Sequence, residues 1–176
     1  MASLTKGFSA SDSDTVGDTV GDTVGHPQSA ALCWRKHRGE MQVLLVTSRE
    51  TGRWVIPKGW PIAGLSAAET AAREALEEAG VIGKVRAVAV GCYGYHKVLD
   101  RATPAPLTLP CSVTVFALRV TELRGRYREV GLRKRKWFAQ ANAAAKVDES
   151  DLQVLIAGFD PEKISGTTWP LADAAE

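Results

Sequence analysis

The stretch from Gly59 to Val81, GWPIAGLSAAETAAREALEEAGV, constrains the fold more than any other part of the chain. Its first residues are typical of a loop, and apolar residues then recur at helical spacing. At about 100° per residue, one apolar face of this helix carries Ala68, Ala72, Ala75, Leu76 and Ala79. The sequence therefore predicts a loop that leads into an amphipathic helix, with the apolar face packed against the rest of the fold.

A second face of the same helix concentrates negative charge. Glu74, Glu77 and Glu78 are related by i,i+3 and i,i+4 spacing, at which like charges repel by roughly 0.2–0.5 kcal/mol per pair. A solvated charged face would tolerate this repulsion. A hard divalent cation such as Mg²⁺ would cancel it, because Mg²⁺ takes carboxylate and water oxygens and shares them with substrate phosphates. The residues around the glutamates favour the second interpretation.

These surrounding residues carry a family resemblance. The stretch resembles the Nudix box, G-x5-E-x7-R-E-U-x-E-E-x-G-U, in which U is an aliphatic residue. The positions that match are Gly59, Arg73, Glu74, Glu77, Glu78, Gly80 and Val81. Pro57-Lys58-Gly59 at the start is also similar to the family, and together with the segment 133–138, RKRKWF, it is closest to diphosphoinositol polyphosphate and dinucleoside polyphosphate hydrolases.

The resemblance implies a role for each matching residue. Glu74 and Glu78 would be the principal metal ligands, and Glu77 a further ligand or a base that orients water. Arg73 would hold the loop and the glutamates in position. The cofactor would be Mg²⁺, with Mn²⁺ as the alternative, and Gly59 would allow close backbone approach where the loop begins.

The chain departs from the box pattern at two positions. Leu65 stands where the pattern has its first glutamate, and the small Ala75 stands at the first aliphatic position. Glu69 does not replace the missing carboxylate in register. With Ser66 it predicts a capping box instead, and it stands four residues before Arg73, the favoured spacing for a helix ion pair.

Substrate phosphates and a further metal ligand require residues outside the box. The candidate phosphate-binding cations are Lys58 with Gly59 beside it, Arg49, Arg53, Arg133 and Arg135. The last two belong to the basic run 133–136. If this run is a strand, only alternate residues face one side and could line the site. A solvated surface is an equally good interpretation of the run. Glu129 is the candidate extra carboxylate, because its spacing before Trp137-Phe138 is similar to a region of many family members.

Composition predicts one domain between two tails. Residues 1–28 contain a Thr-Val-Gly-Asp repeat and are predicted to be disordered, residues 29–158 form the domain, and residues 159–176 form a second tail. The formal net charge is +2, which suits a phosphorylated small molecule and disfavours nucleic acid. The three cysteines lie in apolar or strand-like runs, which predicts buried free thiols. No apolar run suggests a membrane segment or a leader, so a cytoplasmic protein is expected.

The order of the predicted elements is that of an α/β (α+β) fold with one sheet. Strands are predicted at 29–34, 41–47, 53–56, 84–95, 110–120 and 136–140, and helices at 66–79, 141–145 and 150–157. Residues 99–110 contain three prolines and predict a loop. No βαβ alternation occurs. The resemblance implies a Nudix-type α/β/α sandwich with a mixed β-sheet.

Three functions compete at this point. The first is a metal-dependent hydrolase of a pyrophosphate linkage in a phosphorylated small molecule. The second is a non-catalytic module of the same fold that binds a phosphorylated ligand, an alternative that Leu65 keeps open. The third, removal of pyrophosphate from RNA ends, is disfavoured because no basic stretch is interleaved with aromatic residues. The sequence carries no signal for the oligomeric state.

Overall fold

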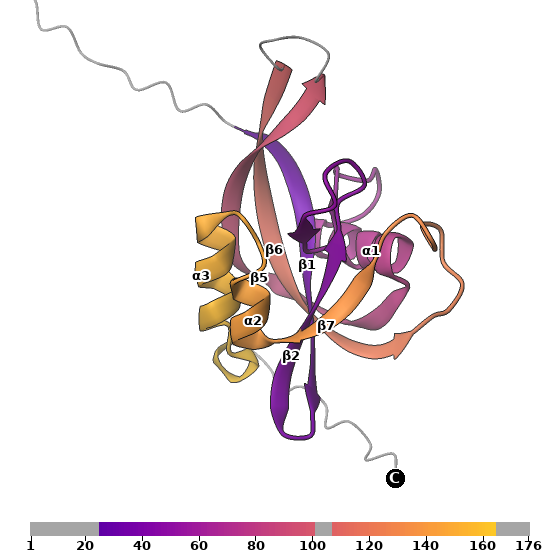
Figure 1. Cartoon of the computed structure of the whole chain (residues 1–176), viewed down its shortest axis with the longest axis vertical. Helices are drawn as coiled ribbons and strands as arrows, with labels where there is room; N and C mark the ends of the chain where they lie inside the picture. Colours follow the sequence, from indigo (N-terminus) through magenta and orange to yellow (C-terminus); the bar gives the residue numbers. More distant parts are fainter. Residues whose placement is uncertain (1–24, 101–106, 165–176) are drawn as a thin grey trace, which may run out of the picture.

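The computed structural model describes residues 25–100 and 107–164, and within them one sheet lies between two helical layers (Figure 1). The strands are β1 (His26–His37), β2 (Glu40–Thr47), β3 (Trp54–Val55), β4 (Lys58–Gly59), β5 (Val81–Asp100), β6 (Leu107–Leu123) and β7 (Arg135–Ala139). The helices are α1 (Ala67–Ala79), α2 (Gln140–Ala144), α3 (Ser150–Gly158) and the 3₁₀ turn η1 (Pro161–Lys163).

The sheet is mixed. Its main order is β3-β2-β1-β6-β5, with β4 paired to β1 and β7 paired to β2. The β1–β6 pair is parallel, whereas every other recorded pair is antiparallel. The predicted α/β/α sandwich with a mixed sheet is therefore confirmed.

Each face of the sheet packs on its own helical layer. Alternate residues of β1 supply both faces, as strand geometry requires: Leu32 and Trp34 belong to the core on the α2 and α3 side, and Ala31 and Cys33 to the core on the α1 side. A strand that is covered on both faces has a nearly continuous run of apolar residues, and residues 29–34 form such a run. Figure 1 shows α1 on one side of the sheet and α2 and α3 on the other.

Helix α1 is capped at both ends. Ser66 is the N-cap, and the predicted capping box with Glu69 is present, since Glu69 N donates to Ser66 Oγ at 3.3 Å and Ser66 N donates to Glu69 Oε2 at 2.8 Å. Gly80 ends the helix at φ 64°, a left-handed conformation that favours glycine. The predicted ion pair from Glu69 to Arg73 is wrong, because Arg73 bonds forward to Glu77 instead.

Several strands are longer than predicted. β1 starts at His26 and continues to His37, so the turn before β2 is confined to Arg38 and Gly39. The predicted loop at 99–110 is shorter, because the β5–β6 ladder continues to the pair Asp100–Leu107; residues 101–106 lie outside the described residues. At the other end, Phe159 is buried against the core on the α2 and α3 side, beyond the predicted domain end.

Cysteine burial follows the prediction at two of three positions. Cys33 and Cys111 are buried free thiols, and Cys92 is a free thiol that is exposed. Cys92 pairs with Thr114 on the long β5–β6 ribbon, where alternate side chains face away from the core. None of the described helices is long and apolar enough to cross a membrane.

The start of β1 yields a test with two deletions. Removing residues 1–24 should leave the melting temperature nearly unchanged, because the repeat offers little apolar area to bury. Removing residues 1–28 also deletes three β1–β6 ladder pairs and the 2.8 Å hydrogen bond from Tyr95 Oη to Gln28 Oε1. We expect the longer deletion to lower the melting temperature by more than about 4 °C, the shift for 1–2 kcal/mol in a domain of this size. Equal melting temperatures in a calorimetric scan would contradict this account.

Candidate functional site

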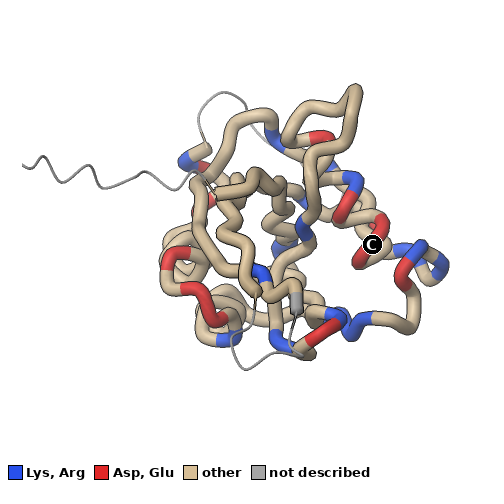
Figure 2. The backbone as a smooth tube through the Cα atoms, turned by 90° about the horizontal axis from the view of Figure 1, so that it is seen from above, with Lys and Arg blue, Asp and Glu red and all other residues tan. Residues whose placement is uncertain are grey.

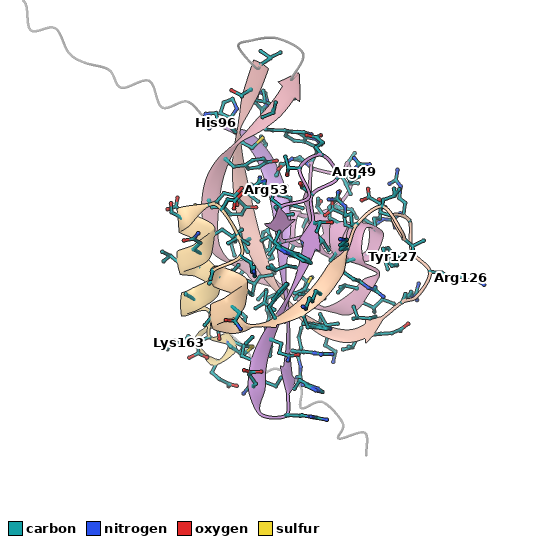
Figure 3. The ribbon with its side chains drawn as sticks, in the orientation of Figure 1. Arg49, Arg53, His96, Arg126, Tyr127 and Lys163 are labelled. Carbon is teal, nitrogen blue, oxygen red and sulfur yellow. The ribbon has the colours of Figure 1, made fainter. Side chains whose placement is uncertain are left out.

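The ends of several elements enclose a cleft of about 860 Å³. Its walls are the β2–β3 connection, β4 with the loop that follows, the charged face of α1, the outer part of β5 and the segment before β7. Figure 3 labels Arg49 and Arg53, which come from the β2–β3 connection, and both residues line the cleft. The volume lies in the range typical of small-molecule sites, about 300–1,000 Å³.

Glu74 lies against the backbone of Gly59. A Cβ built on Gly59 would overlap the end of the Glu74 side chain, so the glycine allows this carboxylate to lie against the backbone. Burial raises the pKa of Glu74, and the nearby Glu77 and Glu129 carboxylates raise it further. The group that approaches the Gly59 backbone is therefore a box carboxylate.

Glu78 is the buried member of the three glutamates. Its Oε2 accepts a hydrogen bond of 3.2 Å from the backbone N–H of Lys58, and its Oε1 is ion-paired with Arg133. Only 9% of each of these two side chains is exposed. Burial raises the pKa of Glu78 to about 7, although Arg133 and Lys58 act in the opposite direction.

Glu77 faces the outer part of the cleft between two arginines. Arg73 Nε donates to Glu77 Oε1 at 2.6 Å, and Arg128 is ion-paired with the other carboxylate oxygen. The hydrogen bond from Arg73 is the main cause that lowers the pKa of Glu77. Arg73 thus holds one oxygen of the Glu77 carboxylate.

Glu129 enters the cleft from the segment before β7. Its Oε2 accepts a hydrogen bond of 2.5 Å from Arg133 Nε, and its Oε1 lies 3.6 Å from Arg49 Nη1. Arg133 also donates to the Thr47 carbonyl oxygen at 3.0 Å. The structure therefore brings the fourth predicted carboxylate to the glutamates of α1. Figure 2 shows acidic and basic positions lying next to each other along the backbone.

The predicted phosphate-binding cations divide into two groups. Lys58, Arg49, Arg53 and Arg133 line the cleft. Arg53 Nη1 also forms an ion pair of 2.5 Å with Oε1 of Glu149, the N-cap residue of α3. Burial lowers the pKa of Lys58, with Glu78 opposing that shift.

Arg135 lies outside the cleft, which corrects its predicted role in substrate binding. Its guanidinium donates to the Ala79 carbonyl oxygen and lies over the Tyr127 ring. Arg133 and Arg135 do not share one strand face, because the strand begins only at Arg135 and Arg133 belongs to a bend before it. The basic run is therefore not one strand.

Several cleft residues are not predicted from the sequence. They are Gln28, Trp60, Tyr95 and Arg128. Tyr95 and Lys97 are two residues apart on β5 and so lie on one face of the strand, and their place in the cleft depends on the length of that strand. Trp60 follows Gly59 directly, and an aromatic residue in a loop beside a glycine is a signal that could have been used.

The chemistry of the donors fits a divalent cation. The carboxylates of Glu77 and Glu129 lie close enough to Glu74 to raise its pKa by repulsion. Carboxylate oxygens are the ligands that Mg²⁺ prefers. Across residues 25–100 and 107–164, no three such groups already converge on one point. In this arrangement Glu77 is ion-paired with Arg128 and Glu78 with Arg133. Exchange of those partners would free the oxygens for an ion.

A comparison with protein families decides the relationship. The NUDIX domain model matches residues 26–157, which includes every strand and helix from β1 to the greater part of α3. This chain belongs to the NUDIX family.

The curated relatives include proteins named diphosphoinositol polyphosphate phosphohydrolases. The mouse protein named diphosphoinositol polyphosphate phosphohydrolase 3-alpha is 33% identical over 118 residues, covering 63% of this chain and 62% of the relative. The human 3-beta protein is 31% identical over 119 residues, covering 66% and 65%. Nudix hydrolase 12 of Arabidopsis thaliana is 33% identical over 104 residues, covering 59% and 51%. The chain therefore spans less than two thirds of each of these relatives.

Solved structures share the NUDIX fold at low identity. A C. elegans Ap4A hydrolase superimposes with a TM-score of 0.52 at 18% identity, over 75% of this chain and 93% of that one. The E. coli dihydroneopterin triphosphate pyrophosphohydrolase gives 0.57 at 16% identity, over 76% and 93%. The NUDIX domain of Shewanella oneidensis NrtR, complexed with ADP ribose, gives 0.54 at 15%, over 80% and 90%.

The contact between Gly59 and Glu74 can be tested with a methyl group. In Gly59→Ala the new Cβ must displace the end of a flexible side chain, so the NUDIX fold should be retained while Glu74 moves. We expect hydrolysis of a good substrate to fall at least about tenfold, or about 1.4 kcal/mol of barrier. Gly125→Ala is the matched control, because no atom lies within 4 Å of its Cβ and its φ is not positive. Equal activity in both variants would show that Glu74 does not depend on Gly59.

The buried Glu78 predicts a pH-dependent stability. Its folded pKa of about 7 lies above the ordinary 4.5, so the folded protein binds the proton more tightly than the unfolded chain. Stability is therefore retained at low pH and lost as pH rises from about 4.5 through 7. With a chelator present, the melting temperatures of Glu78→Gln and of the parent should be compared at pH 5 and at pH 8. The melting temperature of Glu78→Gln minus that of the parent should be higher at pH 8, by about 2–4 °C for each kcal/mol of stability that the parent loses. A difference that is constant with pH would contradict the prediction.

Proposed function

We propose that this chain is a metal-dependent hydrolase that cleaves a phosphoanhydride linkage in a phosphorylated small molecule. The substrate classes in view are nucleoside diphosphates linked to another group, dinucleoside polyphosphates and diphosphoinositol polyphosphates. One observation carries the proposal: four glutamates, Glu74, Glu77, Glu78 and Glu129, line the same cleft as seven Lys and Arg side chains. Phosphoryl transfer needs positioning and charge neutralisation above all.

Each residue has a part in this proposal. Glu74 and Glu78 would hold Mg²⁺, or Mn²⁺ in its place, with Glu129 as an additional oxygen donor. When bound, the ion would supply neutralisation of charge on the phosphate oxygens and a lowered pKa for a coordinated water. Glu77 is a further ligand or orients the attacking water, and Arg73 keeps its carboxylate in place.

The cations of the cleft would bind the substrate phosphates. Lys58 has its side chain over the Tyr95 ring, 4.8 Å from the centroid, next to the Glu78 carboxylate that its own backbone contacts. Arg49 and Arg53 stand at the rim formed by the β2–β3 connection. The names of the curated relatives and of the Ap4A hydrolase support phosphoanhydride chemistry.

A substrate panel tests the proposal. We expect Mg²⁺-dependent phosphate release from at least one of dinucleoside polyphosphates, nucleoside diphosphate sugars, nucleoside triphosphates or diphosphoinositol polyphosphates, and complete loss of release with a chelator. On the best substrate, Glu78→Gln should lower kcat at least about 100-fold, or about 2.7 kcal/mol of barrier. Glu122→Gln is the matched control, because Glu122 is an exposed glutamate of β6 that does not line the cleft.

The outcomes separate the proposal from its alternatives. Turnover that survives chelation, or that is equal in Glu78→Gln and Glu122→Gln, would show that the glutamates are a solvated face. Binding of phosphorylated compounds with no turnover of any would favour a ligand-binding module.

That module is the second candidate function, and a specific observation favours it. Leu65 replaces the first glutamate of the box, and its side chain is 40% exposed at the cleft. Because Leu65 is not buried, Leu65→Glu can restore the carboxylate without a cavity in the core. Turnover that first appears in Leu65→Glu would establish the binding module, whereas turnover in the parent that is kept or increased in Leu65→Glu supports the enzyme.

A further inference from the structure

Glu149 occupies the N-cap position of α3, but its side chain does not cap the helix. The carboxylate accepts no hydrogen bond from the first N–H groups of α3, and glutamate is not among the residues that N-caps favour. The side chain is nevertheless only 10% exposed, and its Oε2 is buried with no hydrogen-bond partner among the described residues. Burial of a half-satisfied carboxylate is unfavourable. The stability of α3 therefore does not explain this side chain.

The carboxylate of Glu149 holds one side of the Arg53 guanidinium. Arg53 Nη1 lies 2.5 Å from Glu149 Oε1 and 3.7 Å from Asp148 Oδ2, and Figure 3 labels Arg53 close to the start of α3. Within residues 25–100 and 107–164, the recorded hydrogen bonds and ion pairs of the Arg53 side chain all use Nη1. A guanidinium presents five N–H donors in a planar fork. Its Nε–Nη2 edge therefore remains for a ligand in the cleft that Arg53 lines.

The backbones on both sides of this ion pair are held by the fold. Ser48 N donates to Arg53 O at 2.8 Å, which closes the β2–β3 connection. Gln153 N donates to Glu149 O at 2.9 Å, and Leu152 of the same helix is fully buried in the core. The ion pair thus joins a fixed position at the start of α3 to a fixed position at the rim of the cleft.

Electrostatic repulsion opposes the position of Arg53 in the cleft. Two cations lie beside the Tyr95 ring, with Lys58 Nζ 4.8 Å and Arg53 Cζ 5.9 Å from its centroid. Burial lowers the pKa of Lys58 and the Arg53 charge lowers it further, whereas the Glu149 charge raises it. Glu149 therefore offsets the repulsion between the two cations. Without Glu149, this repulsion and hydration would draw the Arg53 side chain away from the cleft.

From these contacts we infer that Glu149 is a positioning residue for substrate binding. It holds Arg53 by Nη1, so that the Nε–Nη2 edge faces the cleft and donates to phosphate oxygens of the substrate, the bidentate contact for which a guanidinium is suited. Glu149 is not among the described residues that line the cleft, and it acts through Arg53 alone. This inference rests on the proposed function, because it requires that the cleft binds a polyphosphate.

Equilibrium binding tests the inference with a ligand that contains no anhydride. The probe is the bis-methylene analogue of tripolyphosphate, in which carbon replaces both anhydride oxygens, titrated calorimetrically into the full chain with Mg²⁺. We expect Glu149→Ala and Arg53→Ala each to weaken binding by about tenfold, the scale of one charge-assisted hydrogen bond. Glu149→Gln keeps the length of the side chain and an acceptor oxygen, so its affinity should stay within about threefold of the parent. In the Arg53→Ala background, Glu149→Ala should cause no further loss, because Glu149 acts through Arg53.

The matched control is Asp148→Ala, which removes a carboxylate beside the same guanidinium from a side chain that is 68% exposed. It should bind the probe as the parent does. The melting temperature of each variant is measured in parallel. Glu149→Asp takes the place of Glu149→Ala if the latter shows no cooperative melting, and it should also weaken binding, because it keeps the charge but is too short to hold Arg53 in place.

Three results would overturn the role of Glu149. The first is a lower melting temperature with unchanged affinity in Glu149→Ala, which would indicate a structural role only. The second is equally tighter binding by Glu149→Ala and Glu149→Gln, which would show that only the charge of Glu149 acts on the ligand. The third is parent-like binding by Arg53→Ala. None of these results bears on hydrolysis, because the probe has no scissile anhydride, and a chain without turnover on any substrate would still show or lack the expected pattern of binding.

Discussion

Burial of the Glu78 carboxylate is the constraint on which the rest of the site depends. Taking a carboxylate out of water costs several kcal/mol unless partners compensate, and the raised pKa of Glu78 reflects this cost. Two partners offset it, the backbone N–H of Lys58 and the guanidinium of Arg133. The fold must therefore place β4, with Lys58, and the distant Arg133 on the same side of α1.

The position of Arg133 depends on how the segment before β7 is held against the end of β2. Thr47, at the end of β2, accepts hydrogen bonds from Arg133 through its carbonyl oxygen and from the Lys134 backbone through its hydroxyl, at 3.0 Å each. β7 then pairs with β2 directly after these contacts. The same segment carries Glu129, so the anchor that places a cation for Glu78 also brings the fourth carboxylate into the cleft.

Features that depend on residues close together in the sequence could be predicted, whereas features that depend on the pairing of distant strands could not. The helix, its capping box and its terminal glycine follow from residues within one or two turns of each other, and the sequence predicted all three. Arg135 was misassigned because the start of β7 depends on pairing with β2, which is remote in sequence. Tyr95 and Cys92 were missed for a related reason, since the length of the β5–β6 ribbon decides which residues of β5 meet the cleft and which face outward.

The site combines rigid carboxylates with adjustable counter-charges. Glu74, Glu77 and Glu78 stand on a helix that is capped at both ends and packed along its apolar face, so their Cα positions are determined by the fold. Their partners Arg73 and Arg128 are exposed side chains, and Arg133 divides its guanidinium among Glu78, Glu129 and Thr47. A cation could therefore replace the arginines as counter-charge through side-chain rotation, with no change in the backbone that positions the carboxylates. Preorganisation of this kind is what a metal-dependent site requires of its scaffold.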